Sequence, residues 1–336
     1  MKSVNYTQYL NRLISAAFCY RASRFILEPV LENRFQSSFS HKHCGSFKVF
    51  SVLLVFAYSD PVRAEWVEWL FNSGISFQTD DNINRSFFSG QQKDEYFWSG
   101  YLSGGRVYQL DNNTRIYLTS IFTGDLHHRF QGLDQYTLGG NVTLTHKFGL
   151  GWQAPVLNMT VSSDKIFSAS ELRNGEKILS SLRFSKWLHE RIQAQAGYRF
   201  DYRNGPQSPR EIVTIPSNVF DLQGHSIEAA LNLSVTQTLR LNVSFSSRWG
   251  YIVSNNLPAS VPPEITRQAH ALVKDDVFPG WLYSAKGTTQ TYDTGLSYAF
   301  LEGYALIALS YQHVESQALG LSYQSNQVHL GFNYSN

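Results

Sequence analysis

The side chains best suited to chemistry are those of residues 199–203, where Arg199, Asp201 and Arg203 occupy every second position. Side chains two positions apart lie on one face of a strand, so this spacing predicts two guanidinium groups and one carboxylate on a common surface. Arginine binds carboxylate, phosphate and sulfate groups through parallel hydrogen bonds. The triplet therefore predicts either an anion-binding surface or an Asp201 that neutralises its two neighbours structurally.

Charged residues of other segments occur in the same alternating phase. Together with the triplet they form one predicted set: Arg115, Lys147, Arg183, Arg199, Asp201, Arg203, Glu228, Arg240, Arg248 and Asp293. Two interpretations stay open for this set. It lines a cation-rich interior that favours anions, or it forms a network of ion pairs that fills the interior. The sequence does not show which charges pair, because they belong to separate segments.

Candidates for catalysis and metal binding fail on their spacing. His225 and Ser226 are adjacent, so a strand would place them on opposite faces. His127 and His128 are too close together for a chelating pair on one strand face. His270 with Asp275-Asp276 is a loose group in a polar connection, and a solvated turn explains it better. We predict no catalytic residue, no metal site and no cofactor.

These side chains must be positioned by strands, and the clearest strand pattern is in the segment 226–249, SIEAALNLSVTQTLRLNVSFSSRW. Apolar residues alternate with small or polar ones on both sides of Thr236-Gln237-Thr238, which predicts an antiparallel hairpin with one apolar and one polar face. Each arm has about ten residues, the length that a tilted strand needs to cross a bilayer.

Similar alternation recurs along the chain. The twelve predicted strands are 66–79, 94–108, 114–125, 135–148, 155–163, 177–187, 190–203, 219–235, 239–251, 287–300, 304–316 and 327–334. The connections between them alternate in length. The short ones are 111–113, 188–189, 236–238 and 301–303, with a slightly longer one from Lys147. The long polar ones are 80–93, 126–134, 164–176, 204–218, 252–286 and 317–326. This alternation is typical of a transmembrane barrel with short periplasmic turns and long extracellular loops.

Aromatic residues of the apolar phase gather at the two ends of the predicted strands. One group is Trp66, Trp69, Phe148, Trp152, Phe300, Phe332 and Tyr334, and the other is Tyr198, Phe200, Tyr202, Trp249, Tyr251, Tyr292 and Tyr311. Amphipathic rings form two such bands where a protein crosses both membrane–water boundaries.

Residues 1–64 have the features of a leader. Basic residues around Lys42 and Lys48 precede the apolar segment 49–58, and a small-residue site predicts cleavage after Ala64. Removing 1–64 removes eight of the 28 basic and three of the 26 acidic residues, which leaves a net charge of −3. Both cysteines, Cys19 and Cys44, leave with it. Nucleic-acid binding therefore loses its support, and residues 65–336 are predicted to form one domain.

With these features, residues 65–336 resemble the Gram-negative outer-membrane β-barrel proteins, and the segment 75–88, ISFQTDDNINRSFF, is similar to the Asp- and Asn-rich first loop of several such families. The resemblance implies an all-β fold, a single transmembrane antiparallel up-and-down barrel of about twelve strands, in the outer membrane. The implied partners are outer-membrane lipid and lipopolysaccharide, the barrel-assembly machinery and a small anionic solute. The predicted function is a small, weakly anion-preferring channel for small polar solutes. The alternative is a non-conducting structural or surface-binding barrel.

Overall fold

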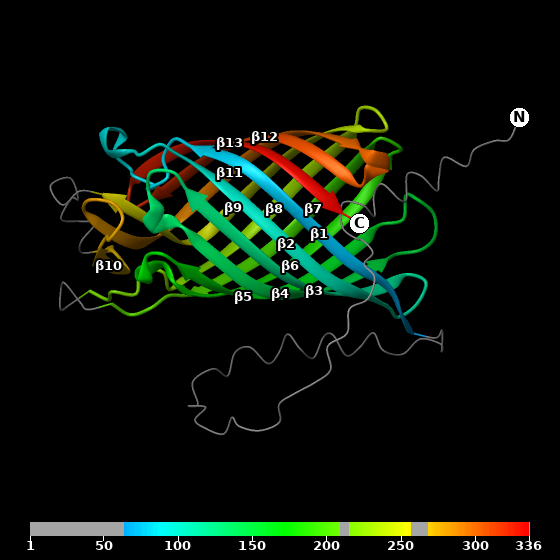
Figure 1. Cartoon of the computed structure of the whole chain (residues 1–336), viewed down its shortest axis with the longest axis horizontal. Coiled ribbons are helices and arrows are strands. Elements are labelled where there is room, and N and C mark those ends of the chain that lie inside the picture. The colour runs from blue at the N-terminus through cyan, green and yellow to red at the C-terminus, as the bar shows by residue number, and fades with distance from the viewer. Residues whose placement is uncertain (1–63, 209–214, 257–267, 336) are drawn as a thin grey trace, which may run out of the picture.

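Twelve antiparallel strands close into one barrel (Figure 1). The computed structural model describes residues 64–208, 215–256 and 268–335. The barrel strands are β1 (Glu65–Asp80), β2 (Glu95–Gln109), β3 (Thr114–His127), β4 (Gln135–Lys147), β5 (Val156–Ser168), β6 (Gly175–His189), β7 (Ile192–Asn204), β8 (Leu222–Ser234), β9 (Leu239–Asn256), β11 (Trp281–Phe300), β12 (Ala305–Ala318) and β13 (Leu321–Ser335). Pairing of β9 with β11 and of β13 with β1 completes the ring. The predicted all-β, up-and-down barrel is confirmed.

The alternation of apolar and polar residues decides which side chains face outward. In the register, Leu231 lies opposite Val243, and Leu241 lies opposite both Leu233 and Leu296. These residues form apolar rows on the outer surface, where Leu231 is 52% and Val243 49% exposed. A one-residue slip would turn every one of these side chains to the other face, so the alternation also fixes the register.

Exposed aromatic rings lie at two levels on the outer surface. Trp66, Trp69, Phe148 and Phe332 are exposed near one end of the strands, and Tyr198, Trp249, Tyr292 and Tyr311 are exposed farther along them. Within the described part of the chain, no helix combines the length and apolar character needed to cross a membrane.

The two ends of the barrel differ in their connections. At the end here called the turn end, β2–β3, β6–β7, β8–β9 and β11–β12 are joined by the short segments 110–113, 190–191, 235–238 and 301–304. The β4–β5 connection, 148–155, is longer. At the opposite end, here called the loop end, polar segments such as 81–94, 128–134 and 169–174 connect the strands, with the short 3-10 helices η2 (Ser89–Gln91), η3 (Gln131–Leu133) and η4 (Glu171–Arg173).

Two predicted loops are partly strand. The prediction of a polar loop over 317–326 is wrong, because β12 and β13 extend to a two-residue turn at Leu319-Gly320, with φ of 55° and 76°. Both values suit the tight turn of a twisted hairpin. In the segment 252–286, β9 continues to Asn256, β11 starts at Trp281, and the extra strand β10 (Ala271–Lys274) pairs with β11 outside the ring. The extensions of β9, β12 and β13 contain many Ser, Asn and Gln residues and show no apolar–polar alternation, and the three apolar residues of β10 are too few to predict a strand.

The buried residues gather mainly at the loop end. One apolar cluster joins Val219 to Ala271, Val273 and Leu282, and another joins Leu272 to Tyr283. A small cluster of Leu70 and Val107 lies inside the barrel near the turn end. The predicted leader, with its apolar segment at 49–58, lies outside the described residues except for Ala64, and β1 begins at Glu65.

Candidate functional site

All ten charged residues predicted to share a surface lie in the inward phase of the strands. The register places Arg115, Lys147, Arg183, Arg199, Asp201, Arg203, Glu228, Arg240, Arg248 and Asp293 opposite to the outward apolar rows. They do not behave as one group. Some are held in ion pairs with each other, and others have no charged partner.

Glu228 holds two arginines in the middle of the barrel. Its carboxylate lies 2.5 Å from Arg199 Nη2 and 3.4 Å from Arg183 Nη2. The three side chains come from β6, β7 and β8, which are neighbours in the ring. Two guanidinium groups thus share one carboxylate, so this group keeps a net positive charge.

Asp201 pairs with an arginine of another strand. Arg248 donates from Nε to Asp201 Oδ1 at 3.0 Å and from Nη2 to Oδ2 at 2.6 Å, and its Nη1 donates to the carbonyl oxygen of Tyr251. Two parallel hydrogen bonds of this kind fix both position and orientation. This ion pair fits a structural role for Asp201, but the salt-bridge partner is Arg248, and neither Arg199 nor Arg203 forms a salt bridge with Asp201.

Arg203 is held without a carboxylate. Its Nη2 donates to the carbonyl oxygen of Arg173, and its guanidinium group lies over the ring of Phe220, 4.5 Å from the centroid. Its Nε is buried and has no acceptor among the described residues. Leaving a buried donor unsatisfied costs about 1–3 kcal/mol, and more for a charged group.

Three cations near the turn end lack an ion pair. Within the described part of the chain, no acidic side chain forms a salt bridge with Arg115, Lys147 or Arg240. Arg115 and Lys147 come from the paired strands β3 and β4, and Arg240 comes from β9, on the far side of the ring. They therefore place positive charge on two facing walls of the interior.

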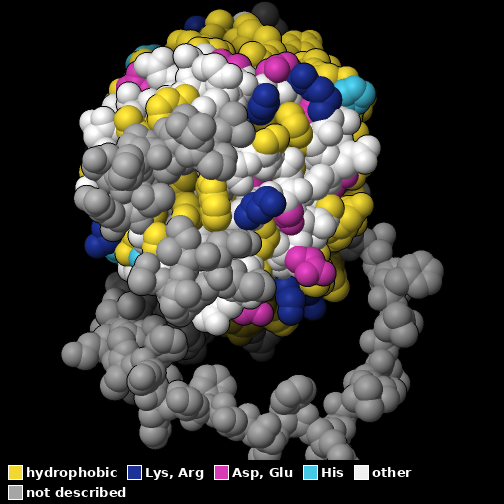
Figure 2. Space-filling view, turned by 90° about the vertical axis from the view of Figure 1, so that its left-hand side faces the viewer, with side chains coloured by type: hydrophobic (Ala, Val, Ile, Leu, Met, Phe, Trp, Pro, Cys, Tyr) yellow, Lys and Arg dark blue, Asp and Glu magenta, His cyan; other side chains and the backbone are white. Residues whose placement is uncertain are grey.

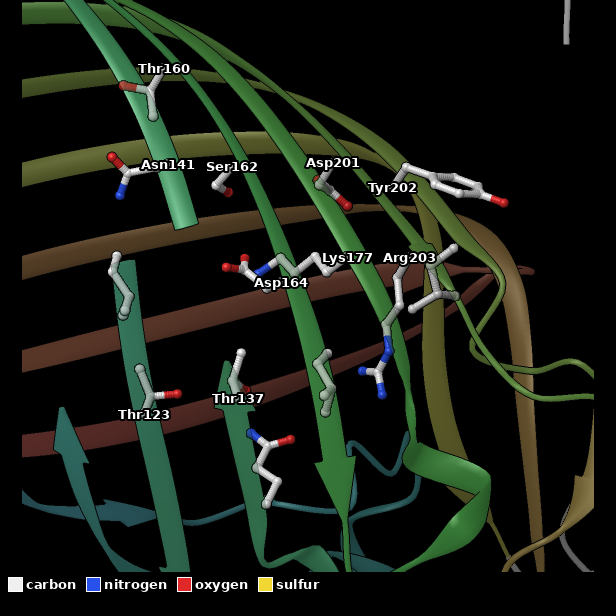
Figure 3. A pocket seen from close by; sticks show the side chains of 14 residues that line it. Thr123, Thr137, Asn141, Thr160, Ser162, Asp164, Lys177, Asp201, Tyr202 and Arg203 are labelled. Carbon is white, nitrogen blue, oxygen red and sulfur yellow. The ribbon is translucent and has the colours of Figure 1, made fainter. Parts of the chain in front are cut away.

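A cavity of about 600 Å³ lies inside the barrel against β3–β8. Its lining includes Thr123, Gln135, Thr137, Asn141, Thr160, Ser162, Asp164, Lys177, Asp201 and Arg203. Figure 3 shows the guanidinium group of Arg203 extending from β7 towards the space that the hydroxyl and amide side chains surround. Of the cavity's charged residues, sequence reasoning found Asp201 and Arg203 but missed Lys177 and Asp164, although both occur in the inward phase.

A hairpin lies across the loop end of the barrel. We call residues 271–283, which comprise β10, the turn 275–280 and the start of β11, the cap. The ring of Phe278 in the cap packs edge-on against Phe130 of the β3–β4 connection, with centroids 4.7 Å apart. Since β3–β4 and β9–β11 lie on opposite sides of the ring, the cap crosses the mouth. Figure 2 looks onto this end, where acidic, basic and apolar side chains lie together.

Arg173 ties the cap to the β5–β6 connection. Its Nη2 lies 2.8 Å from Asp275 Oδ1, and its Nη1 lies 2.8 Å from Asp276 Oδ1. The Asp275 side chain is fully buried and also accepts hydrogen bonds from Asn255 Nδ2 and from the backbone N–H of Val277. Sequence reasoning missed this group, because its members come from loops about a hundred residues apart.

The first connection, 81–94, is bound to the same end by buried polar groups. Asn82 donates to the carbonyl oxygens of Ser86 and Gln324, and the Ser86 hydroxyl donates to Asn256 Oδ1 at 2.8 Å. Asn256 in turn donates to the hydroxyl oxygen of Tyr283 in the cap. Burial raises the pKa of Tyr283 to about 12. The Asp- and Asn-rich first loop is therefore a structural part of the closed loop end.

The candidate catalytic residues do not come together. His225 faces outward and bonds Tyr198 through Nδ1 at 2.6 Å, whereas Ser226 is buried on the inward side. His270 stacks on Tyr251 with centroids 4.2 Å apart, and Asp275 is engaged by Arg173. His127 and His128 stack on two different rings, those of Phe97 and Tyr96. Among the described residues, no three acidic, His or Cys side chains are grouped to hold a metal ion.

Comparison with known proteins supports the fold. The COG4313 outer membrane channel from Pseudomonas putida F1 is similar to this chain with a TM-score of 0.51 and 13% identity, covering 83% of this chain and all of that channel. At that identity the similarity concerns the fold alone. Two porin structures are more distant. The NanC porin has a TM-score of 0.43 and 10% identity, covering 77% of this chain and 98% of that porin. The KdgM porin in complex with disordered oligogalacturonate has a TM-score of 0.41 and 8% identity, covering 79% of this chain and 99% of that porin.

No family model matches the chain, and no curated protein matches it. The barrel closure, the outward apolar surface and the first of these similarities define the class: the chain has the fold of a porin-like outer-membrane β-barrel.

Proposed function

We propose that this barrel is an outer-membrane channel that passes small polar solutes with a weak preference for anions. The observation that carries the proposal is the division of charge inside the barrel. Arg115, Lys147 and Arg240 have no ion pair among the described residues, Glu228 and Asp201 are both engaged by arginines, and Asp293 is the one carboxylate of the predicted set without a salt bridge there. A surplus of uncompensated cations raises the local concentration of anions, and salt weakens the effect.

The proposed setting is the outer membrane of a Gram-negative cell, reached by export with the predicted leader. The outward rows of Leu, Val and Ile and the two levels of exposed aromatic rings suit a hydrocarbon layer between two polar boundaries. Lipopolysaccharide and other outer-membrane lipids would then contact this surface, and the barrel-assembly machinery would insert it. Catalysis is not part of the proposal, and the three compared structures are channels or porins.

Ion selectivity of the purified full chain in a planar bilayer tests the proposal. With a potassium chloride gradient across the bilayer, we expect a reversal potential of the sign that indicates chloride preference. Replacing Arg115, Lys147 and Arg240 together by Gln should move that potential towards cation preference. Arg191→Gln is the matched control, because Arg191 is an exposed arginine in a turn-end connection. A wild-type reversal potential showing cation preference would refute the anion claim.

The second candidate is a barrel that does not conduct. The cap across the mouth and the ion pairs in the middle of the barrel favour it, since both fill space that a solute would need. Absence of current from the wild type and from a variant whose cap is released, Arg173→Ala, would support this candidate over the channel.

A further inference from the structure

The cavity against β3–β8 has an uneven chemical character, with apolar patches from Ile121, Ile166, Tyr202 and Leu222 between its polar groups. Four polar side chains on β3, β4 and β5 face it without a hydrogen-bond partner among the described residues: Thr123, Thr137, Asn141 and Ser162. Each can donate or accept, so this wall suits a ligand that carries several hydroxyl groups. The cavity of about 600 Å³ falls within the range that small-molecule sites occupy.

The adjoining part of the lining carries the charge. Lys177 on β6 and Arg203 on β7 line the cavity together with Asp164 on β5 and Asp201 on β7. Asp201 is already engaged by Arg248 through both oxygens. Asp164 lies opposite Lys177 in the register but forms no ion pair with it. Two cations therefore face one carboxylate that no cation neutralises directly, which leaves room for one further negative charge.

Arg203 is held in a fixed position at this cavity. Its Nη2 donates to the Arg173 carbonyl oxygen and its guanidinium group lies over the Phe220 ring, while its Nε is closed off from solvent. A guanidinium group that is already ordered loses little side-chain freedom when it binds a carboxylate. A carboxylate in the cavity would therefore lie against this group, and the hydroxyl wall would bind the rest of the same molecule.

We propose that this cavity binds a small organic anion that carries one carboxylate and several hydroxyl groups. The carboxylate lies against Arg203 and Lys177, and the hydroxyl groups face Thr123, Thr137, Asn141 and Ser162. The site deepens the proposed channel function by naming its solute class, but binding itself requires only that the solute reach the interior. The two claims can therefore fail separately.

Calorimetric titration of the full chain in detergent tests the site directly. The probe is sodium gluconate, which has one carboxylate and a chain of hydroxyl groups. Sorbitol lacks the charge and hexanoate lacks the hydroxyl groups. We expect gluconate to bind with a dissociation constant at least tenfold lower than that of either comparison compound. Equal binding of sorbitol or of hexanoate, or no binding of gluconate, overturns the proposal.

Variants locate the binding in the cavity. Arg203→Gln and Lys177→Gln should each weaken gluconate binding about tenfold, and Arg203→Lys should restore part of the loss. Arg191→Gln, which removes an exposed arginine in a turn-end connection outside the cavity, is the control and should bind as the wild type does. Each variant is first checked for the heat-modifiable gel migration of a folded barrel. If Arg203→Gln does not fold, Lys177→Gln decides, and an unchanged affinity in the folded variants overturns the proposal.

Conductance separates this proposal from the channel. Gluconate binding without any current would support the binding site and refute the channel. Current with chloride preference and no gluconate binding would support the channel and refute the binding site.

Discussion

The two ends of the barrel use charged residues in different ways. At the loop end, Arg173 and Arg248 each engage carboxylates through two nitrogens, and Arg173 and its partner Asp275 are both buried. At the turn end, Arg115, Lys147 and Arg240 face the interior without an ion pair among the described residues. Apart from Lys177 and Arg203, which line the cavity, these charges at the loop end hold structure together, and those at the turn end are available to act on a solute.

The difference follows from the connections. Among the described residues, the connections at the turn end are too short to fold over its inward side chains, whereas the segments 81–94, 169–174 and 271–283 fold over the loop end and bury polar groups there. A buried charge requires a partner, so burial at one end also selects for ion pairs at that end.

The largest effect is expected where the buried ion pair is broken. Arg173→Ala leaves the fully buried Asp275 without its cation, and removing one partner of a buried pair costs about 3–5 kcal/mol. We expect the cap, residues 271–283, to lose protection against amide hydrogen exchange by about a hundredfold or more. Lys165→Ala is the control, because Lys165 and Glu176 form an exposed pair 3.9 Å apart, and exposed pairs contribute little to stability. Equal protection of the cap in both variants would contradict the structural role of Arg173.

A second effect concerns pH at the loop end. The pKa of Tyr283 is raised by burial to about 12, from an ordinary value of 10.0. The contribution of this phenol to stability is therefore complete below pH 10 and is lost as the pH rises towards 12, by about 2–3 kcal/mol. Absorbance titration at 295 nm should show a late step that Tyr283→Phe removes. If Tyr283→Phe instead lowers the amplitude of the step near pH 10 and leaves the late step unchanged, Tyr283 is accessible to solvent.

The smallest effects compare an arginine from each group. Arg248→Gln removes the bidentate pair with the partly buried Asp201 and should lower the free energy of unfolding by about 1–2 kcal/mol. Arg115→Gln removes no ion pair and should change it by less than about 0.5 kcal/mol. Urea unfolding followed by tryptophan fluorescence measures both. If Arg115→Gln costs as much as Arg248→Gln, the distinction between structural and available cations fails.

Much of the barrel was predictable from the sequence, because the alternation of apolar and polar residues along a strand is a local property. Leu231 and Val243 could be assigned to the outer face, and Arg199, Asp201 and Arg203 to the opposite one, from period-two spacing alone. The β12–β13 extension escaped prediction because its Ser, Gln and Asn residues have no apolar phase. The partners of Asp201 and Arg173 escaped it because they are set by closure of the ring and by loop packing.

In the proposed channel function, solutes cross the barrel and the cap lies in their way. A disulfide tests it, because a Cβ atom built at Gly132 would lie 3.4 Å from Val277 Cβ, close to disulfide geometry. The variant is Gly132→Cys with Val277→Cys, in a chain whose Cys19 and Cys44 are replaced by Ser. Oxidation should lower its planar-bilayer conductance, and reduction should restore it to the level of the parent chain. Conductance that is the same in the oxidised and reduced states would contradict the claim.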